Sequence, residues 1–287
     1  ATLGNDTYDG GDGTDTIDFS NIDVSVDVNF VTNTAVYGEN TTRVTYFENV
    51  TLGDTDDSIT LASNNAAVTI SGGDGVDTLT YISDANLSIT NFAFGATTAN
   101  TLTPDGNRHT YTSIEQFVSG AGNDNLAASA GAANFDGGAG DDTINGTANA
   151  DTLMGGAGND LINVTAGDDS LDGGEGIDAL NISAATNDVI IDLSTDWEST
   201  LTVTGLGSNT LTNFEGVLAG SGDDAITGSD GDDVIGGGDK RPGGDGWVDS
   251  SFIENDGNKS ADQCSDDDDA HHRTGDGEAD AEVLLDD

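Results

Sequence analysis

The chain has 287 residues, of which 34% are hydrophobic and 41 are glycine, and 54 acidic residues against 6 basic ones give a formal charge of −48. This composition argues against ordinary globular packing, and the charge excludes nucleic acid and anionic membranes as partners because both would be repelled. No apolar run approaches the length of a membrane span, so membrane insertion is not expected, and the single cysteine excludes an intramolecular disulfide framework.

Two nine-residue units open the chain, ATLGNDTYD (1–9) and GGDGTDTID (10–18), each with aspartate at position six. Nine residues are too few for a helix pair or a βαβ unit, so each unit is expected to be half a coil of a parallel solenoid. Asp6 and Asp15 would then lie on opposite edges. They lack partners eighteen residues away unless more coils precede them, so we expect the chain to be a piece of a longer protein.

Three longer segments, 10–61, 72–127 and 173–227, each begin with a glycine-rich turn and end alike, in YFENVTLGDTDDSIT, SIEQFVSGAGNDNLA and NFEGVLAGSGDDAIT. Each ending has a glutamate nine residues before a turn aspartate. Runs such as DVSVDVNFV, NLSITNFAF and DVIIDLSTDW lie between these anchors and predict strands, because β-branched residues dominate. We interpret the segments as an internal triplication of wider coils that continue the same solenoid.

Seven nonapeptides then follow one another without a gap from Ser119 to Asn181. Their position-eight residues are large and apolar and are expected to point inward: Leu126, Phe135, Ile144, Leu153, Ile162, Leu171 and Leu180. Their position-six residues are Asp124, Ala133, Asp142, Asp151, Asp160, Asp169 and Asp178. The glycines at positions one, two and four can adopt φ > 0 and let neighbouring backbones approach closely.

Two nonapeptides make one coil, so aspartates eighteen residues apart stack about 4.8 Å from each other. Such ladders of carboxylates would repel unless a hard cation lies between successive turns and backbone carbonyls complete an oxygen shell. Calcium suits this ligand set, whereas magnesium prefers a small octahedron and zinc prefers His or Cys. We therefore predict several bound Ca²⁺ ions.

The candidate metal sites fall into groups. One edge carries Asp124, Asp142, Asp160 and Asp178, with turn glycines Gly138, Gly140, Gly156, Gly158, Gly174 and Gly176. The other edge carries Asp151 and Asp169, whose glycine-poor turns are expected to bind weakly or not at all. Outlying candidates are Asp6, Asp15, Asp57, Asp77, Asp224 and Asp233. Asp57 and Asp77 are twenty residues apart and need a two-residue bulge to pair, while Asp224 and Asp233 lie on opposite edges as half-sites.

The pattern GGxGxDxUx is intact at 10–18, 72–80, 137–145 and 155–163, and it resembles the hemolysin-type RTX calcium-binding repeat. The resemblance implies an all-β fold, a right-handed parallel β-roll or β-solenoid with calcium-binding GGxGxD turns. It also implies type I secretion from a Gram-negative-type or cyanobacterial cell, and hence an extracellular or cell-surface location.

We divide the chain into a solenoid with two long coils (1–118), the regular roll (119–181), a third long coil with terminal repeats (182–239), and an acidic tail (240–287). The tail combines low hydrophobicity with an SDDDDAHH run, so we expect disorder there. Folding is expected to depend on calcium, because the apo chain repels itself.

The sequence offers little for catalysis. It contains no HExxH or GxSxG motif, and the repeat region has one histidine, His109, which we expect at the surface. The aromatic residues Tyr46, Phe47, Phe92 and Phe94 could form a glycan platform with Trp197, but core packing is the preferred interpretation for the phenylalanines.

We therefore predict a non-catalytic, calcium-folded structural or adhesive module of a large secreted or cell-surface bacterial protein. The alternative is the C-terminal secretion and folding domain of an exoenzyme or toxin whose catalytic domain lies upstream. A third hypothesis is glycan binding. Cell-surface polymers or glycans are possible partners, and self-association is possible too.

Overall fold

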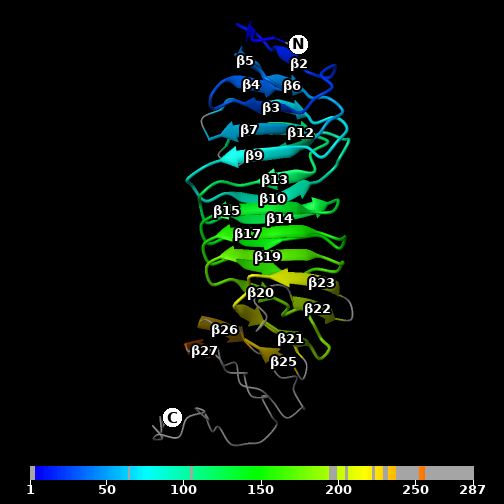
Figure 1. The fold of residues 1–287 in the computed structure, drawn as a ribbon, viewed down its shortest axis with the longest axis vertical. Coiled ribbons are helices and arrows are strands. Elements are labelled where there is room, and N and C mark those ends of the chain that lie inside the picture. Colours follow the sequence, from blue (N-terminus) through cyan, green and yellow to red (C-terminus); the bar gives the residue numbers. More distant parts are fainter. Residues whose placement is uncertain are drawn as a thin grey trace, which may run out of the picture.

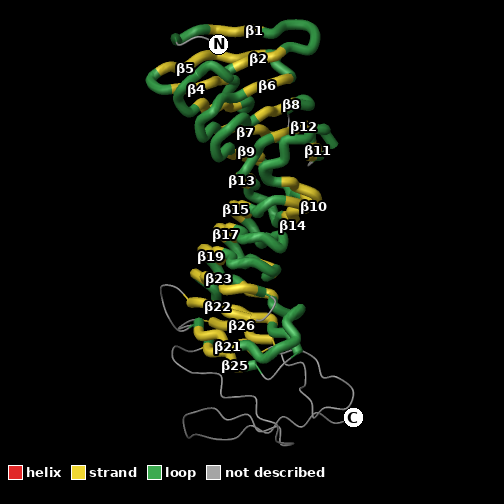
Figure 2. Tube along the Cα trace, turned by 90° about the vertical axis from the view of Figure 1, so that its right-hand side faces the viewer, coloured by secondary structure: helices red, strands yellow, loops and turns green. Residues whose placement is uncertain are grey.

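The computed structural model describes residues 4–63, 65–103, 106–193, 199–203, 206–221, 224–228, 232–236 and 252–255. These residues form strands and turns, with no helix among them, and therefore none that could cross a membrane. The strands lie one above another along the long axis of the molecule (Figure 1), and the view turned by 90° shows a narrow stack (Figure 2). Most strand pairs are parallel, which confirms the predicted all-β solenoid.

Four sheets make up the solenoid. The largest has twelve strands, in the order β1 (Thr7–Asp9), β5 (Asn40–Thr45), β4 (Thr34–Tyr37), β3 (Val26–Asn29), β7 (Ser58–Ala62), β9 (Thr78–Ile82), β13 (Gln116–Val118), β15 (Asn134–Ala139), β17 (Thr152–Ala157), β19 (Ser170–Glu175), β23 (Gly207–Thr212) and β22 (Ser199–Val203).

The other three sheets are shorter. An eight-stranded sheet runs β10 (Ser88–Ala93), β14 (Asn125–Ala130), β16 (Thr143–Asn145), β18 (Leu161–Asn163), β20 (Ala179–Asn181), β24 (Gly216–Leu218), β26 (Asp232–Gly236) and β27 (Phe252–Asn255). A five-stranded sheet runs β11 (Asn100–Leu102), β12 (His109–Thr112), β8 (Thr69–Ser71), β6 (Asn49–Thr51) and β2 (Thr16–Asp18). The last pairs β21 (Ile190–Asp192) with β25 (Ala225–Thr227).

The regular roll has the predicted eighteen-residue register. Phe135 pairs with Leu153 and Leu153 with Leu171, while on the other face Leu126 pairs with Ile144 in the same way. All seven position-eight side chains are buried and belong to one continuous core. The apolar repeat is therefore what holds successive coils together, since each coil buries its large side chains against the next.

The turn glycines have two separate roles. Most of those at positions two and four have positive φ, such as Gly156 and Gly158 with φ of 116° and 136°, in the region that favours glycine. The position-one glycines of the roll are not among the residues with positive φ, contrary to the sequence-based expectation. They are needed for another reason, because a Cβ on Gly137 would collide with Asp142 and with the carbonyl oxygen of Gly155.

The three longer segments differ from the wider coils that we expected. Their additional residues fold back as antiparallel strands: β3 with β4 and β4 with β5, then β11 with β12, then β22 with β23. The strands that flank these hairpins keep the parallel register, with Ile17 opposite Val50, Leu79 opposite Phe117, and Leu180 opposite Val217. Each segment is thus an ordinary coil with antiparallel strands inserted, two hairpins in the first segment and one in each of the others.

The aromatic side chains of the second segment pack in the core, as predicted for the phenylalanines. Phe92 stacks on Tyr111 with ring centroids 4.5 Å apart, and Phe94 meets Phe135 edge-on at 4.9 Å. Tyr46 is exposed instead. The surface position expected for His109 is wrong, because the residue faces inward from β12, is completely buried, and accepts a hydrogen bond from the Val68 N–H at Nδ1.

Several sequence-based predictions fall outside the described residues. Trp197 is one of them, and so is most of the acidic tail predicted to be disordered (240–287). Within that tail, β27 is described and pairs antiparallel with β26.

Candidate metal centre

Four aspartates form a ladder along one edge of the regular roll, which we call the glycine-rich edge. They end the turns before β14, β16, β18 and β20 and are all buried: Asp124, Asp142, Asp160 and Asp178. The backbone N–H of each of the first three donates to Oδ1 of the aspartate one coil later, over 2.6, 2.7 and 2.7 Å. One carboxylate oxygen of each side chain therefore links neighbouring coils.

The second oxygen of these carboxylates has no such partner. Oδ2 is buried and makes no hydrogen bond in any of the four side chains. Burial raises the pKa of Asp142 and of Asp178 to about 7, and neighbouring carboxylates contribute in the same direction. Burial also raises the pKa of Asp124 and Asp160. Because a buried charge without a partner is costly, these oxygens mark places where a cation is needed.

The opposite edge of the roll is built differently, and we call it the threonine edge. Its column runs Ala133, Asp151, Asp169 and Asn209, with N–H to Oδ1 hydrogen bonds of 2.6, 3.0 and 2.9 Å. Asp151 is satisfied within the protein, because the Thr147 N–H donates to its Oδ2 at 2.6 Å and the Thr147 hydroxyl contacts its Oδ1 at 3.1 Å. Asp169 has an unpartnered Oδ2, and burial raises its pKa to about 6.

The residue at position four of the turn separates the two kinds of aspartate. Seven aspartates in the described residues have a buried Oδ2 without a hydrogen bond: Asp15, Asp77, Asp124, Asp142, Asp160, Asp169 and Asp178. All seven follow a glycine by two residues. Asp57 and Asp151 instead follow Thr55 and Asn149, and in both turns the position-two N–H, of Gly53 or Thr147, reaches Oδ2.

Main-chain oxygens stand beside the unpartnered carboxylate oxygens. A Cβ on Gly137 would collide with both Asp142 Oδ2 and the carbonyl oxygen of Gly155, so the two oxygens lie beside the same point. In front of Gly155, Asp160 Oδ2 and the carbonyl oxygen of Gly173 lie in the same way. Hard oxygen ligands from two successive coils thus converge on one point, which is the ligand chemistry that calcium prefers.

These residues fit calcium better than a metal held by side chains alone. No group of three or more His, Cys, Asp or Glu side chains is placed to hold a metal ion in the described part of the chain. Backbone carbonyls would therefore complete the shell, and the aspartates Asp142, Asp160 and Asp178 would supply the charge. A bound Ca²⁺ would neutralise carboxylates that otherwise repel one another.

The outlying predicted residues divide into paired and unpaired ones. Asp57 and Asp77 are in direct register, with the Asp57 N–H donating to Asp77 Oδ1 at 2.9 Å. The two additional residues lie between β7 and β8, since Val68 to Asp77 keeps the nine-residue spacing. Asp15 has no aspartate one coil later, and its N–H donates to Glu48 Oε2 at 2.9 Å.

The remaining outlying predictions are Asp6, Asp224 and Asp233. Asp6 is exposed, and its N–H lies 3.5 Å from the Thr42 hydroxyl, so a threonine takes the next place in its column. Asp224 accepts a hydrogen bond from the Val189 N–H at 3.0 Å. The side chain of Asp233 lies outside the described residues.

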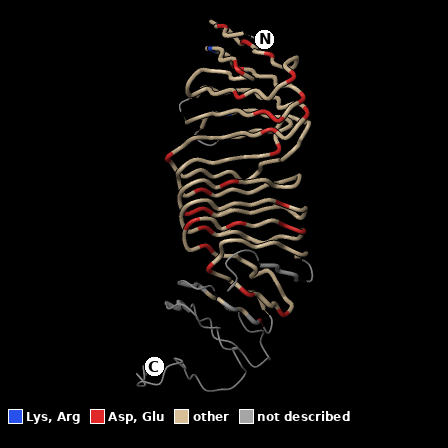
Figure 3. The backbone as a smooth tube through the Cα atoms, in the orientation of Figure 1, with Lys and Arg blue, Asp and Glu red and all other residues tan. Residues whose placement is uncertain are grey.

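The acids at position five, Asp141 and Asp168, face solvent, but they also bond to neighbouring coils. Asp141 accepts from the Asn159 N–H at 2.9 Å, and Asp168 accepts from the Ser208 N–H at 2.9 Å. Acidic residues therefore mark the turns at both margins of the roll in Figure 3. Sequence analysis did not foresee this outer ladder, although the recurring Asn or Asp at position five is its signal.

Sequence analysis also missed three glutamates that occupy the aspartate position of a coil. Glu48, Glu115 and Glu215 each accept the N–H of the aspartate one coil earlier, at 2.9, 2.9 and 2.8 Å. Their shared spacing ahead of the next turn was visible in the sequence. Their stacking was not, because the inserted hairpins separate them from those aspartates by more than thirty residues.

Comparison with known families agrees with this geometry. The family model of the RTX calcium-binding nonapeptide repeat matches the chain in four copies, at residues 1–18, 118–153, 145–180 and 217–239. No curated protein matches the chain. The matched residues include both edges of the regular roll and the turns that hold Asp142 and Asp160. The chain therefore carries the RTX calcium-binding nonapeptide repeat in these four stretches, and its described residues fold as a parallel β-solenoid.

Proposed function

We propose that this chain is a calcium-folded structural or adhesive module of a large secreted or cell-surface protein. The observation that carries the proposal is the set of buried Oδ2 atoms without hydrogen bonds, stacked at successive glycine-rich turns. Two carboxylates about 4.8 Å apart repel by roughly 3 kcal/mol at an effective dielectric constant near 20. A column of four such groups opposes folding unless cations lie between them.

The energy available from calcium is large enough to control folding. With a Kd of roughly 10⁻⁴ M and calcium near 1 mM, each site adds about 1.4 kcal/mol by mass action. Four stacked sites would add roughly 5 to 6 kcal/mol, comparable to the net stability of a whole domain. At sub-micromolar calcium the same sites add almost nothing. The chain would therefore stay unfolded inside a cell and fold after export.

The alternative, a secretion and folding domain attached to an exoenzyme, shares this calcium dependence. The internal triplication favours the structural role, because three copies of one coil-plus-hairpin unit lengthen the solenoid. A zinc-protease or lipase motif in a preceding part of the parent gene would favour the exoenzyme instead. Adhesion to a cell-surface polymer or glycan would use the outer faces of the same solenoid.

The test is a calcium titration followed by far-UV circular dichroism and by isothermal calorimetry. We expect a transition from coil to β structure that needs higher calcium in Asp142→Ala and in Asp160→Ala. Glu175→Ala is the matched control, because this side chain lies in a glycine-rich turn but is exposed to solvent. A β signal that is equally strong after chelation would overturn the proposal.

A further inference from the structure

Three short turns in the chain share one conformation, and we call them the glutamate turns: Tyr46–Glu48, Ser113–Glu115 and Asn213–Glu215. Each replaces the six-residue glycine-rich turn with three residues. The first residue of each has a positive φ, of 59°, 50° and 55°, although none is glycine. This left-handed conformation costs about 1 kcal/mol in a residue with a side chain, so its occurrence in all three copies indicates a common structural requirement.

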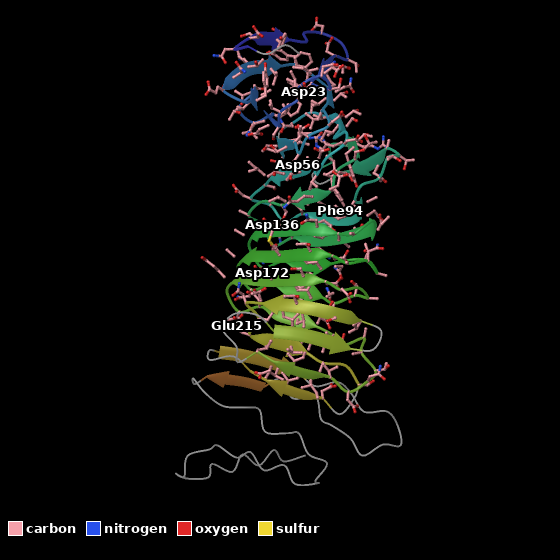
Figure 4. The ribbon with its side chains drawn as sticks, turned by 45° about the vertical axis from the view of Figure 1, so that its right-hand side comes forward. Asp23, Asp56, Phe94, Asp136, Asp172 and Glu215 are labelled. Carbon is pink, nitrogen blue, oxygen red and sulfur yellow. The ribbon has the colours of Figure 1, made fainter. Side chains whose placement is uncertain are left out.

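Each glutamate turn stacks directly on a glycine-rich turn. The N–H groups of Glu115 and Gln116 both donate to the Asp77 carbonyl oxygen at 3.0 Å, while the Asp77 N–H donates to Glu115 Oε2. The same three hydrogen bonds recur where Glu48 stacks on Asp15 and where Glu215 stacks on Asp178. The glutamate thus accepts the bond that the next aspartate accepts within the regular roll. Figure 4 shows Glu215 in the lower part of the solenoid.

The oxygen arrangement of the regular turns is kept at these junctions. In front of Gly72, Asp77 Oδ2 and the carbonyl oxygen of Ser113 lie where a Cβ would be. In front of Gly173, Asp178 Oδ2 and the carbonyl oxygen of Asn213 lie in the same way. In the regular roll, the first glycine of the next turn supplies that carbonyl. The left-handed residue of the glutamate turn therefore takes the place of this glycine.

The aspartates at the junctions also need a partner. Asp77 and Asp178 are 0% exposed, and in both Oδ2 makes no hydrogen bond. Two carboxylates and a carbonyl oxygen thus meet at each junction, with no basic side chain among the hydrogen-bond partners of Asp77 or Asp178. An acidic pair by itself would not identify a site, but a completely buried carboxylate oxygen directed at a carbonyl oxygen does call for a cation.

We propose that each junction between a glycine-rich turn and a glutamate turn holds a further Ca²⁺ ion, with Glu48, Glu115 and Glu215 supplying the second carboxylate. The proposal rests on the calcium binding proposed above and extends it to a second type of site. The additional methylene of glutamate lets its carboxylate reach the aspartate N–H from the shorter turn. Asp15 is only half-buried, so the first junction is expected to bind calcium more weakly than the other two.

With these sites, the column of stacked ions would continue along the solenoid as far as the coil that contains a hairpin insertion. The residue stacked below Glu48 is Val68, since the Thr69 N–H donates to the Glu48 carbonyl oxygen. The residue below Glu115 is Ala133, since Phe117 pairs with Phe135. In both copies a neutral residue therefore follows the glutamate in its column, and the glutamate completes the last ion site before that neutral coil.

The test is a count of bound calcium in the full chain by equilibrium dialysis, with thermal unfolding followed in parallel. Glu115→Gln, Glu215→Gln and the triple variant with Glu48→Gln keep an oxygen that accepts the aspartate N–H and remove the charge. We expect one ion fewer in each single variant and three fewer in the triple variant. Glu175→Gln, the same change at an exposed position in the glycine-rich turn of the third junction, should lose none.

Asp160→Asn distinguishes this proposal from the proposed function. If Asp160→Asn loses calcium while the triple glutamine variant keeps the full number of ions, the junction sites are refuted and the calcium-folded roll remains. If the wild-type chain binds no calcium, both fall. A glutamine variant that stays unfolded at calcium concentrations that fold the wild type would assign the glutamate to folding alone, and would also refute the junction sites.

Discussion

The glycine-rich edge and the threonine edge of the regular roll stack the same residue type at the same spacing, yet Asp160 on the first edge and Asp151 on the second have their carboxylates satisfied differently. At Asp160 the protein supplies a hydrogen-bond donor to Oδ1 only. At Asp151 the Thr147 N–H donates to Oδ2, and the Thr147 hydroxyl contacts Oδ1. The difference follows position four of the turn, which is Gly158 before Asp160 and Asn149 before Asp151. The residue at position four thus correlates with whether the protein supplies a hydrogen-bond donor to Oδ2 of the buried carboxylate.

The largest expected effect is on the pH dependence of folding without calcium. The folded-state pKa of Asp142 and Asp178 is about 7, against 3.8 for an unperturbed aspartate, so folding favours their protonated forms. The stabilising effect of protonation is fully present below pH 4 and is lost as the pH rises through about 7. Each unit of raised pKa corresponds to about 1.4 kcal/mol. We therefore expect resin-treated, calcium-free chain to fold near pH 4.5 and to unfold near pH 8.

Two variants check the origin of this pH dependence. Asp142→Asn should flatten the profile of β structure against pH between 4 and 7, because it removes one of the titrating groups. Asp151→Asn should change the profile less, because the Thr147 N–H already donates to that carboxylate. Equal profiles in the two variants would mean that the edges do not differ in the way the hydrogen bonds indicate.

A smaller but still large effect is expected when alanine replaces the position-four residue. Gly158 has φ of 136°, and a Cβ there would collide with the carbonyl oxygen of Gly140. Gly158→Ala should therefore cost about 3 kcal/mol or more, from backbone strain and overpacking together. Asn149→Ala removes a hydrogen bond of 2.8 Å to the Gly131 carbonyl oxygen and should cost about 1 kcal/mol.

Urea unfolding in saturating calcium measures both changes on one scale. The comparison needs matched m-values, since a change in m would indicate an altered unfolded state. A loss in Asn149→Ala as large as that in Gly158→Ala would show that the close approach of coils is equally demanding on both edges.

Much of this organisation could be predicted from the sequence, because the repeat is periodic. The eighteen-residue spacing placed Asp142, Asp160 and Asp178 in one ladder, and position eight gave the core. The periodicity could not show where hairpins are inserted, because Val, Ile and Thr predict strands without giving their direction. It also could not show that Thr147 reaches Asp151, since that contact depends on the path of one turn.

The glutamate turns are the clearest case of a signal that was seen but not interpreted. The glutamates stand in the same place in three endings, which indicated a common unit. Their partners are 33 to 38 residues away along the chain, at Asp15, Asp77 and Asp178. Spacing alone could not find these partners, because the hairpins between them differ in length.

The next effect concerns the number of bound ions on each edge. Asp160→Asn removes a carboxylate whose Oδ2 has no protein partner, so at least one ion should be lost at 1 mM calcium. The stabilisation by calcium should fall by about 1.4 kcal/mol for each site lost. Asp151→Asn should keep the wild-type number of ions. Equilibrium dialysis counts the ions, and loss of an ion from Asp151→Asn would contradict the distinction between the edges.

The smallest expected effect is a gain of one site on the threonine edge. Thr147→Gly together with Asn149→Gly converts GTANAD at 146–151 into GGAGAD, which removes the hydroxyl and permits a positive φ at position four. The Asp151 carboxylate should then lack a protein partner for Oδ2, as Asp160 does, and should bind one additional ion.

The two new glycines cost about 1 kcal/mol or more in chain entropy, which nearly cancels the roughly 1.4 kcal/mol from the ion at 1 mM calcium. The double variant should therefore unfold at close to the wild-type temperature in 1 mM calcium and clearly below it as the calcium concentration is lowered. An unchanged ion count would mean that glycine at position four is not sufficient to create an ion site. The unpartnered Oδ2 of the Gly155–Asp160 turn would then depend on its neighbours in the column.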